Sequence, residues 1–147
     1  MEAHIGVDTE SGLVHTARGT PANVNDALES NCLLHDEETD AFGDAGYQGV
    51  HKRPDTRSSV NWHMAMMPGL RRVLNKSTPL DALIDQVERI KVRNRAKVEH
   101  LFRVIKRQFG YTMVGYRGLK KKTAQLVIQF AQSNLRMSRG KSLAAKA

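Results

Sequence analysis

The chain has 147 residues, of which 40% are hydrophobic and 26% are charged, as in a single soluble globular domain. No apolar run reaches about 18 residues, so no transmembrane helix is expected. The opening MEAHIGVDTE lacks the basic and apolar regions of a secretory signal. A single cysteine, Cys32, excludes an internal disulfide and a CxxC zinc site. These features predict a protein of the reducing cytoplasm.

Charge is distributed unevenly along the chain, although the formal net charge is only +8. Residues 1–50 contain ten acidic residues and one basic residue, a net charge of −9. Residues 51–147 contain 22 basic and five acidic residues, a net charge of +17. A segment this basic is typical of a protein that binds a polyanion, most often nucleic acid. A basic protein without such a partner is the alternative that charge alone leaves open.

Short strands and one helix are expected in the first half of the chain. Apolar alternation and turn residues predict a hairpin of two strands, 3–7 and 13–17, and later strands at 40–43 and 62–66. The Pro68-Gly69 pair closes the last strand. Apolar residues at helical spacing predict a helix over 23–34 that Asn23 caps.

The second half is predicted to be helical. Helices are expected over 80–90, over 92–109 with Gly110 after its end, and over 120–136. The last of these should bury the face formed by Ala124, Val127, Ile128, Ala131 and Leu135. Strands first and helices later predict an α/β domain over residues 1–139, with helices packed on a sheet and a disordered tail at 140–147.

The helix predicted over 92–109 carries an unusual carboxylate. Glu99 is the only acidic residue in positions 90–147, and it lies at the edge of the apolar face, flanked by Arg95, Arg103 and Lys106. A surface of i,i+4 salt bridges accounts for this pattern. From these residues alone, that interpretation is favoured. The alternative is a metal-binding carboxylate beside phosphate-binding cations, because phosphoryl transfer needs both.

Asp44 is the best candidate for a second carboxylate. It directly follows the strand predicted over 40–43 and precedes Ala45-Gly46-Tyr47. An aspartate at a strand end, with small residues after it, leaves room for a metal and a phosphate. A plain turn aspartate is the alternative. We interpret Asp8, in the predicted hairpin turn, as a turn residue.

Several blocks of the sequence resemble bacterial insertion-sequence transposases of the DDE type, in the IS-four/IS-five superfamily. These are AHIGVDTESGLVHT, TPANVNDA, FGDAGYQG, WHMAMMPG and NRAKVEHLFRVIKRQFGYTMVGYRGLKKKTAQL. The resemblance covers about residues 2–139. The family signature Y-x2-R-x3-E-x6-K matches at Arg95, Glu99 and Lys106, whereas Val92 stands at its tyrosine position.

The resemblance implies an RNase H-like fold with a mixed sheet, and catalytic, metal-binding roles for Asp44 and Glu99. It implies Mg²⁺ or Mn²⁺ as cofactor and transposon-end and target DNA as partners. The family's first catalytic aspartate, on the first strand of its fold, has no match here. We therefore expect the C-terminal portion of a transposase, weak or inactive alone. The residues expected to contact DNA are Arg95, Lys97, Arg103, Lys106, Lys120 and Lys121.

Other functions remain open at this stage. The chain could be a non-catalytic DNA-binding protein that regulates transposition, by associating with a second copy or with a full-length transposase. A structural RNA-binding protein is a third hypothesis, and a solvated helix start is the alternative for Lys120 and Lys121. In each case we expect a cytoplasmic protein, associated with the bacterial nucleoid and not with a membrane.

Overall fold

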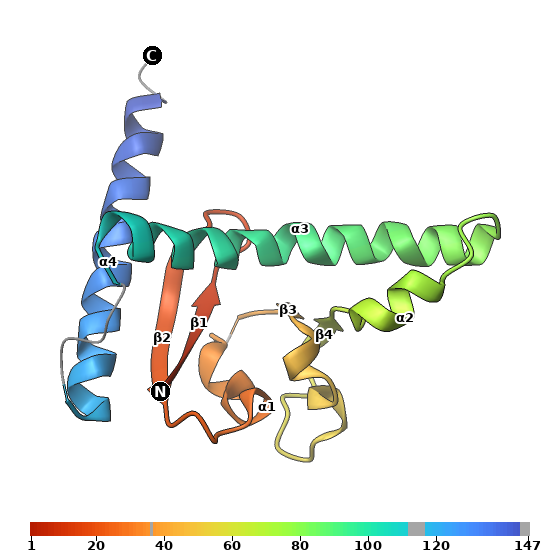
Figure 1. Ribbon diagram of the computed structural model, residues 1–147, viewed down its shortest axis with the longest axis horizontal. Coiled ribbons are helices and arrows are strands. Elements are labelled where there is room, and N and C mark those ends of the chain that lie inside the picture. Colours follow the sequence, from red (N-terminus) through yellow and green to blue (C-terminus); the bar gives the residue numbers. More distant parts are fainter. Residues whose placement is uncertain (36, 112–116, 145–147) are drawn as a thin grey trace. The chain divides into compact units, whose positions relative to one another are not determined.

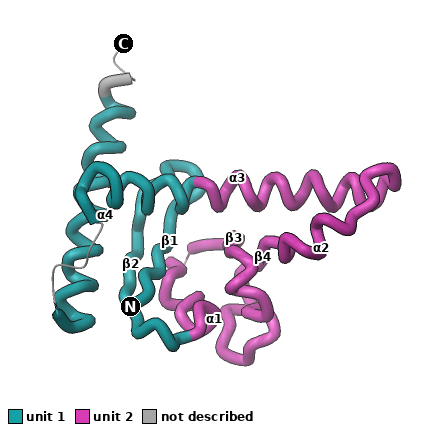
Figure 2. Tube along the Cα trace, in the orientation of Figure 1, with its two compact units in different colours: residues 1–24, 97–147 teal, residues 25–96 magenta. Residues whose placement is uncertain are grey.

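The computed structural model describes residues 1–35, 37–111 and 117–144 (Figure 1). The chain divides into two compact units, Met1–Val24 with Lys97–Ala147, and Asn25–Ala96 (Figure 2). The long helix α3 (Pro79–Gln108) contributes its first part to the second unit and its last part to the first unit.

The first unit is built on a hairpin. Strand β1 (Glu2–Val7) pairs antiparallel with β2 (Val14–Thr20), which confirms the predicted hairpin. The Asp8 carboxylate closes the turn by accepting a hydrogen bond from the Ser11 amide at 2.5 Å. Hydrogen bonds from Ser11 lower the pKa of Asp8, as expected of an aspartate that caps a turn. Asp8 is therefore a turn residue, as the sequence indicates.

Helices pack on this hairpin and form the core of the unit. The buried residues come from β2, from the end of α3, and from α4 (Leu119–Ala144). Phe130 of α4 meets Phe102 of α3 edge to face, with ring centroids 5.6 Å apart. The buried apolar residues of this core are Val14, Leu101, Ile105, Leu126 and Phe130. The helix predicted over 92–109 thus buries an apolar face, as expected, with Leu101 and Ile105 fully buried.

Close backbone contact joins α4 to β2 at both ends of the strand. At one end, Asn134 Oδ1 accepts a hydrogen bond from the Val14 amide at 2.9 Å, and Asn134 Nδ2 donates to the Val14 carbonyl at 2.6 Å. At the other end, a Cβ on Gly19 would collide with the Thr123 hydroxyl. Only glycine permits this approach.

The buried face of α4 differs from the predicted one. The prediction of the buried face is wrong, because all five of its residues are exposed: Ala124, Val127, Ile128, Ala131 and Leu135. The helix carries two apolar stripes, and the buried stripe contains Phe130, whose large ring fills the space beside α3. Helix α4 continues to Ala144, beyond the predicted end at residue 136. The predicted tail, 140–147, therefore overlaps the helix, and residues 145–147 lie outside the described residues.

The second unit contains a parallel strand pair. Strand β3 (Asp40–Gly43) has the predicted bounds and pairs parallel with β4 (Asn61–Met64), in a register that places Phe42 beside His63. The expected single mixed sheet is not seen among the described residues, because the two strand pairs belong to different units and form separate two-stranded sheets. The helical elements are α1 (Asp26–Glu29), η1 (Ser30–Leu33), η2 (Ala45–Tyr47), η3 (Val50–Lys52) and α2 (Pro68–Val73).

Several local predictions need correction. The helix expected over 23–34 begins after Asn25, whose side chain accepts a hydrogen bond from the Ala27 amide, and it turns into a 3₁₀ helix after Glu29. The two helices expected over 80–90 and 92–109 are one helix, since no glycine or proline interrupts that stretch. Helix α2 forms where only a closing turn was expected, because Pro68 suits the first position of a helix. Gly110 follows α3 at φ 62°, as predicted.

Candidate active site

Asp44 lies directly after β3, where the strand ends and the chain turns into η2. Its backbone is still extended, with φ −80° and ψ −177°, and its Oδ1 accepts a hydrogen bond from the Gly46 amide at 2.8 Å. This bond caps η2, so Asp44 has the turn role that the sequence also allowed. The side chain is half-buried, which leaves part of the carboxylate accessible to a ligand.

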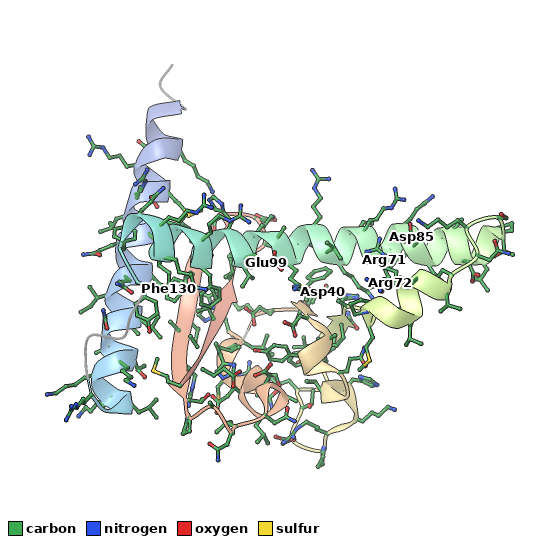
Figure 3. All side chains as sticks on the ribbon, viewed as in Figure 1. Asp40, Arg71, Arg72, Asp85, Glu99 and Phe130 are labelled. Carbon is green, nitrogen blue, oxygen red and sulfur yellow. The ribbon has the colours of Figure 1, made fainter. Side chains whose placement is uncertain are left out.

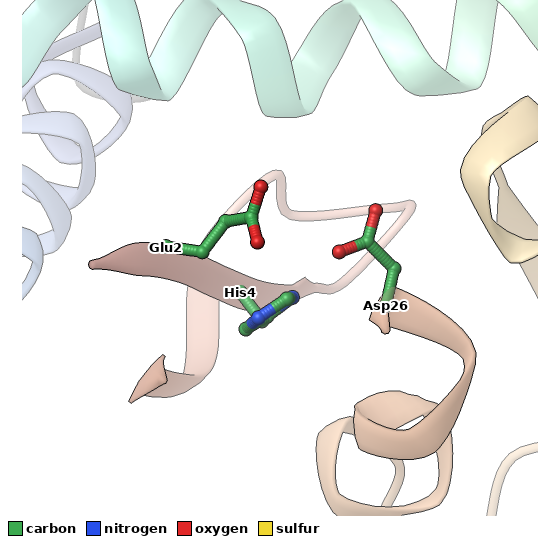
Figure 4. A group of neighbouring side chains, drawn as sticks. All are labelled: Glu2, His4 and Asp26. Atoms are coloured by element: carbon green, nitrogen blue, oxygen red, sulfur yellow. The ribbon is translucent and has the colours of Figure 1, made fainter. Parts of the chain in front are cut away.

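A second carboxylate of the same unit lies beside Asp44. Asp26 is the first residue of α1 (Figure 4), and it comes close to η2 at Gly46. A Cβ built on Gly46 would lie 2.8 Å from Asp26 Oδ2 and 3.0 Å from Asp44 Oδ1. A larger residue at position 46 would therefore displace one or both of these carboxylates. No sequence pattern marks Asp26 as a functional residue, although it lies in one of the blocks that carry the family resemblance.

Glu99 is exposed on α3 (Figure 3), and its neighbours along the helix are cations. Arg95, Arg103 and Lys106 are exposed as well and follow at spacings of three and four residues. The stretch therefore presents one carboxylate within a basic surface, as predicted. Asp44 and Glu99 belong to different units, so their meeting at one metal site stays a prediction.

The lysines expected to contact DNA have different environments. The Lys97 ammonium donates to the Thr9 carbonyl and so braces the hairpin turn. Lys120 and Lys121 are exposed at the start of α4, a helix without any acidic residue. Lys120 also lines a shallow apolar groove with Gly19 and Val127. Contact of these three lysines with DNA stays a prediction.

A buried ionic network, which the sequence did not reveal, fixes α3 to the rest of the second unit. Asp85 of α3 is 4% exposed and accepts hydrogen bonds from Arg71 at 2.9 Å and from Arg89 at 3.0 Å (Figure 3). Glu88, also 4% exposed, accepts from the Met66 amide and from Lys91, both at 2.8 Å. These contacts position the strand end and α2 along the helix, and thereby support the element that leads to Glu99.

Comparison with known proteins identifies the family. The model described as the transposase DDE domain matches residues 1–135. This chain belongs to the transposase DDE domain family. No solved structure matches the chain, so the family assignment rests on the sequence match, with which the small sheets and helices of the fold are compatible.

Membership in the transposase DDE domain family indicates DNA transposition as the process, DNA as the partner and a divalent metal as the cofactor. Among the described residues, no helix combines the length and apolar content needed to cross a bilayer. Carboxylate oxygens are the ligands that Mg²⁺ and Mn²⁺ prefer. Asp44, at the end of β3, offers a half-buried carboxylate of this kind. The donor chemistry of Asp44 therefore fits the metal that the family uses.

Proposed function

We propose that this chain is the catalytic portion of an insertion-sequence DNA transposase of the IS-four/IS-five superfamily, with an RNase H-like fold. Asp44 and Glu99 would hold Mg²⁺ or Mn²⁺. The observation that carries this proposal is the position of Asp44. It stands at the carboxyl end of a parallel strand, half-buried, beside a glycine that leaves space at its carboxylate. Ligand sites in α/β sheets form at that end of the strands.

The reaction is a displacement at phosphorus. The oxygen of a water molecule, or of a 3′-hydroxyl, forms a bond to a DNA phosphorus as the bond to the leaving oxygen breaks. The attacking group gives its proton to solvent, and the leaving oxygen accepts one. The divalent metal supplies Lewis acidity for the attacking and leaving oxygens. The chain's own contribution is to hold that cofactor through Asp44 and Glu99.

The exposed cations position the DNA. Arg95, Arg103 and Lys106 extend along α3 on both sides of Glu99, and each can bind a phosphate oxygen. Lys120 and Lys121 supply a second basic surface at the start of α4. Lys97 is the remaining candidate. To bind a phosphate, its ammonium would have to break the hydrogen bond to the Thr9 carbonyl or donate to both oxygens at once. Contacts of this kind fix the register of the duplex without reading its sequence.

We infer that the site is completed by a strand that carries a further aspartate and comes from another segment or chain. Among the residues that the structure describes, each sheet has two strands, and sheets of two strands are marginal on their own. The isolated chain should then have weak catalytic activity, because one metal ligand is absent.

A cleavage assay tests the proposal. Duplex DNA carrying the terminal sequences that flank the gene is incubated with Mg²⁺, with the chain alone and with the chain plus its upstream coding segment. We expect strand cleavage only in the second case, and its loss in Asp44→Asn and Glu99→Gln. The Asp55→Asn variant is the control, because it removes an exposed carboxylate paired only locally with Arg53. Cleavage that survives both carboxylate substitutions contradicts the assignment.

A non-catalytic DNA-binding regulator is the second candidate. The acid-free, exposed start of α4 favours it, since that surface can bind DNA without any metal site. Binding and cleavage separate the two functions. Arg95→Ala should weaken DNA binding in both cases, whereas Glu99→Gln should leave it intact. DNA binding without cleavage, even with the upstream segment present, would favour the regulator.

A further inference from the structure

Helix α3 carries a stripe of exposed apolar side chains in the second unit. Its large members are Leu80, Leu83, Val87 and Ile90. They recur at spacings of three and four residues, and Asn94 continues the series. At about 100° per residue, these five residues, the α3 seam, lie within about 80° of the helix circumference. A stripe this narrow has the width of a coiled-coil seam, whereas a helix that faces a protein core usually buries a wider face.

The contacts that fix α3 within its unit use a different face. Asp85 and Glu88, which bind α2 and the residues after β4, lie about 180° and 120° from the centre of the α3 seam. The same stripe continues along the helix at Leu101 and Ile105, which are fully buried in the core of the first unit. Helix α3 therefore buries this stripe near its C-terminal end and leaves it exposed near its N-terminal end.

The order of residues in the α3 seam is that of a two-stranded coiled coil. Leu80, Val87 and Asn94 take the a positions of a heptad, and Leu83 and Ile90 take the d positions. A β-branched residue at a with leucine at d, as at Val87 and Leu83, favours two parallel strands. A single asparagine at an a position sets the register of such a pair, because it would lie opposite its own copy.

The charges beside the α3 seam allow a second copy to approach. A parallel copy would place Gln86 beside Lys91 and Arg93 beside Val98 across the seam, so no like charges oppose each other there. Lys91 is already paired with Glu88 at 2.8 Å. The remaining charged residues of this stretch take outward heptad positions; these are Asp81, Asp85, Glu88, Arg89 and Arg95.

We propose that the α3 seam is a self-association surface, through which two copies of this chain form a parallel pair of helices over residues 80–94. The inference goes beyond the proposed function and does not depend on the metal site. Because α3 is already helical in the single chain, pairing has to order side chains only, which keeps the entropic cost of association low.

Sedimentation equilibrium of the full chain tests the proposal, from about 1 to about 200 µM and in about 0.3 M NaCl, which screens the net charge of +8 on each copy. We expect a monomer–dimer equilibrium whose Kd rises about tenfold or more in Val87→Glu, since the seam would bury the new charge. Val92→Glu is the matched control. Val92 is 43% exposed and Val87 is 44% exposed on the same helix, but Val92 lies about 160° from the centre of the seam.

The circular dichroism spectrum of each variant shows whether α3 stays helical, as expected for substitutions at exposed positions. A chain that remains monomeric throughout, or an equal effect of the two glutamate variants, overturns the proposal. Association with the upstream coding segment instead, weakened by Val87→Glu and not by Val92→Glu, would assign the seam to that segment and likewise overturns it.

Two further variants test the register. In a Cys32→Ser background, which removes the one native cysteine, Leu80→Cys should form an intermolecular disulfide on mild oxidation, because parallel pairing places it opposite its own copy. Val92→Cys in that background should not. Asn94→Val should lower the dimer Kd several-fold, because a polar residue at an a position costs stability. A dimer without the Leu80→Cys crosslink, or an unchanged Kd in Asn94→Val, overturns the parallel register.

Discussion

Asn134 hydrogen-bonds to both backbone polar groups of Val14, a residue 120 positions away in the sequence. The amide side chain of Asn134 thus supplies the two backbone hydrogen bonds that a neighbouring strand would otherwise make with Val14 of β2. Asn134→Leu has similar volume but leaves the Val14 amide and carbonyl without this partner. We expect a loss of about 1–3 kcal/mol in the free energy of unfolding, measured by urea denaturation. Gln132→Leu, an exposed substitution on the same helix, should change the free energy of unfolding by less than about 0.5 kcal/mol.

Phe130 is the largest side chain in the core of the first unit, and it is 2% exposed. Phe130→Ala removes its packing and the edge-to-face contact with Phe102. We expect the free energy of unfolding to fall by about 3–5 kcal/mol. Leu135→Ala is the matched control because Leu135 is 73% exposed. Equal destabilisation by the two variants would show that the buried face of α4 is assigned wrongly.

Acid should lower the folding stability of the second unit by protonating its buried carboxylates. The hydrogen bond from Arg71, with the charges of Lys76 and Arg89, lowers the pKa of Asp85. Burial raises the pKa of Glu88, but hydrogen bonds from Lys91 and the Met66 amide outweigh it and leave the pKa lowered. A pKa lower in the folded than in the unfolded chain gives stability at neutral pH that is lost as the pH falls.

We therefore expect Tm to be nearly constant from about pH 7 to pH 5 and to drop below about pH 4, where these carboxylates gain protons. The double variant Asp85→Asn with Glu88→Gln should be less stable at neutral pH and should show a smaller fall in Tm in acid. A Tm that falls equally steeply in the double variant would point to other carboxylates.

The start of α4 should contribute to the salt dependence of DNA binding. Each phosphate contact adds about 0.9 to the slope of log K against log salt concentration. The double variant Lys120→Gln with Lys121→Gln should therefore reduce that slope by about 1.8, if both side chains contact phosphates. Arg53→Gln is the control, because Asp55 already pairs with Arg53 at 3.0 Å. An unchanged slope would mean that these lysines are merely solvated.

Local patterns of the sequence predict much of the fold. Alternating apolar residues and the turn around Asp8 predict the hairpin, and Gly110 predicts the end of α3. Asp44 was recognisable as a strand-end carboxylate because its neighbours are small. These features depend on residues adjacent in the chain, whose conformational preferences survive in the folded state.

Features that depend on tertiary packing were not predictable. Helix α4 has two apolar stripes, and the sequence cannot tell that Phe130 faces α3 while Ile128 faces solvent. Asp26 approaches Gly46 only because α1 folds against η2, and its spacing from Asp44 matches no metal-ligand motif. In the sequence, Asp85 resembles an exposed helix residue. It is buried in the structure because α2 packs beside it and Arg71 of α2 donates a hydrogen bond to its carboxylate. Each of these contacts joins residues separated by ten or more positions.

The two contacts between α4 and β2, Thr123 with Gly19 and Asn134 with Val14, also fix how many residues each element has between them. From Thr123 to Asn134 the helix advances eleven residues, or about 16 Å at 1.5 Å per residue. From Gly19 back to Val14 the strand covers five residues, again about 16 Å at 3.3 Å per residue. Helix and strand are thus matched in span and opposite in direction. Insertion or deletion of one residue between either pair of anchor points would break one attachment, whereas added residues beyond them would not.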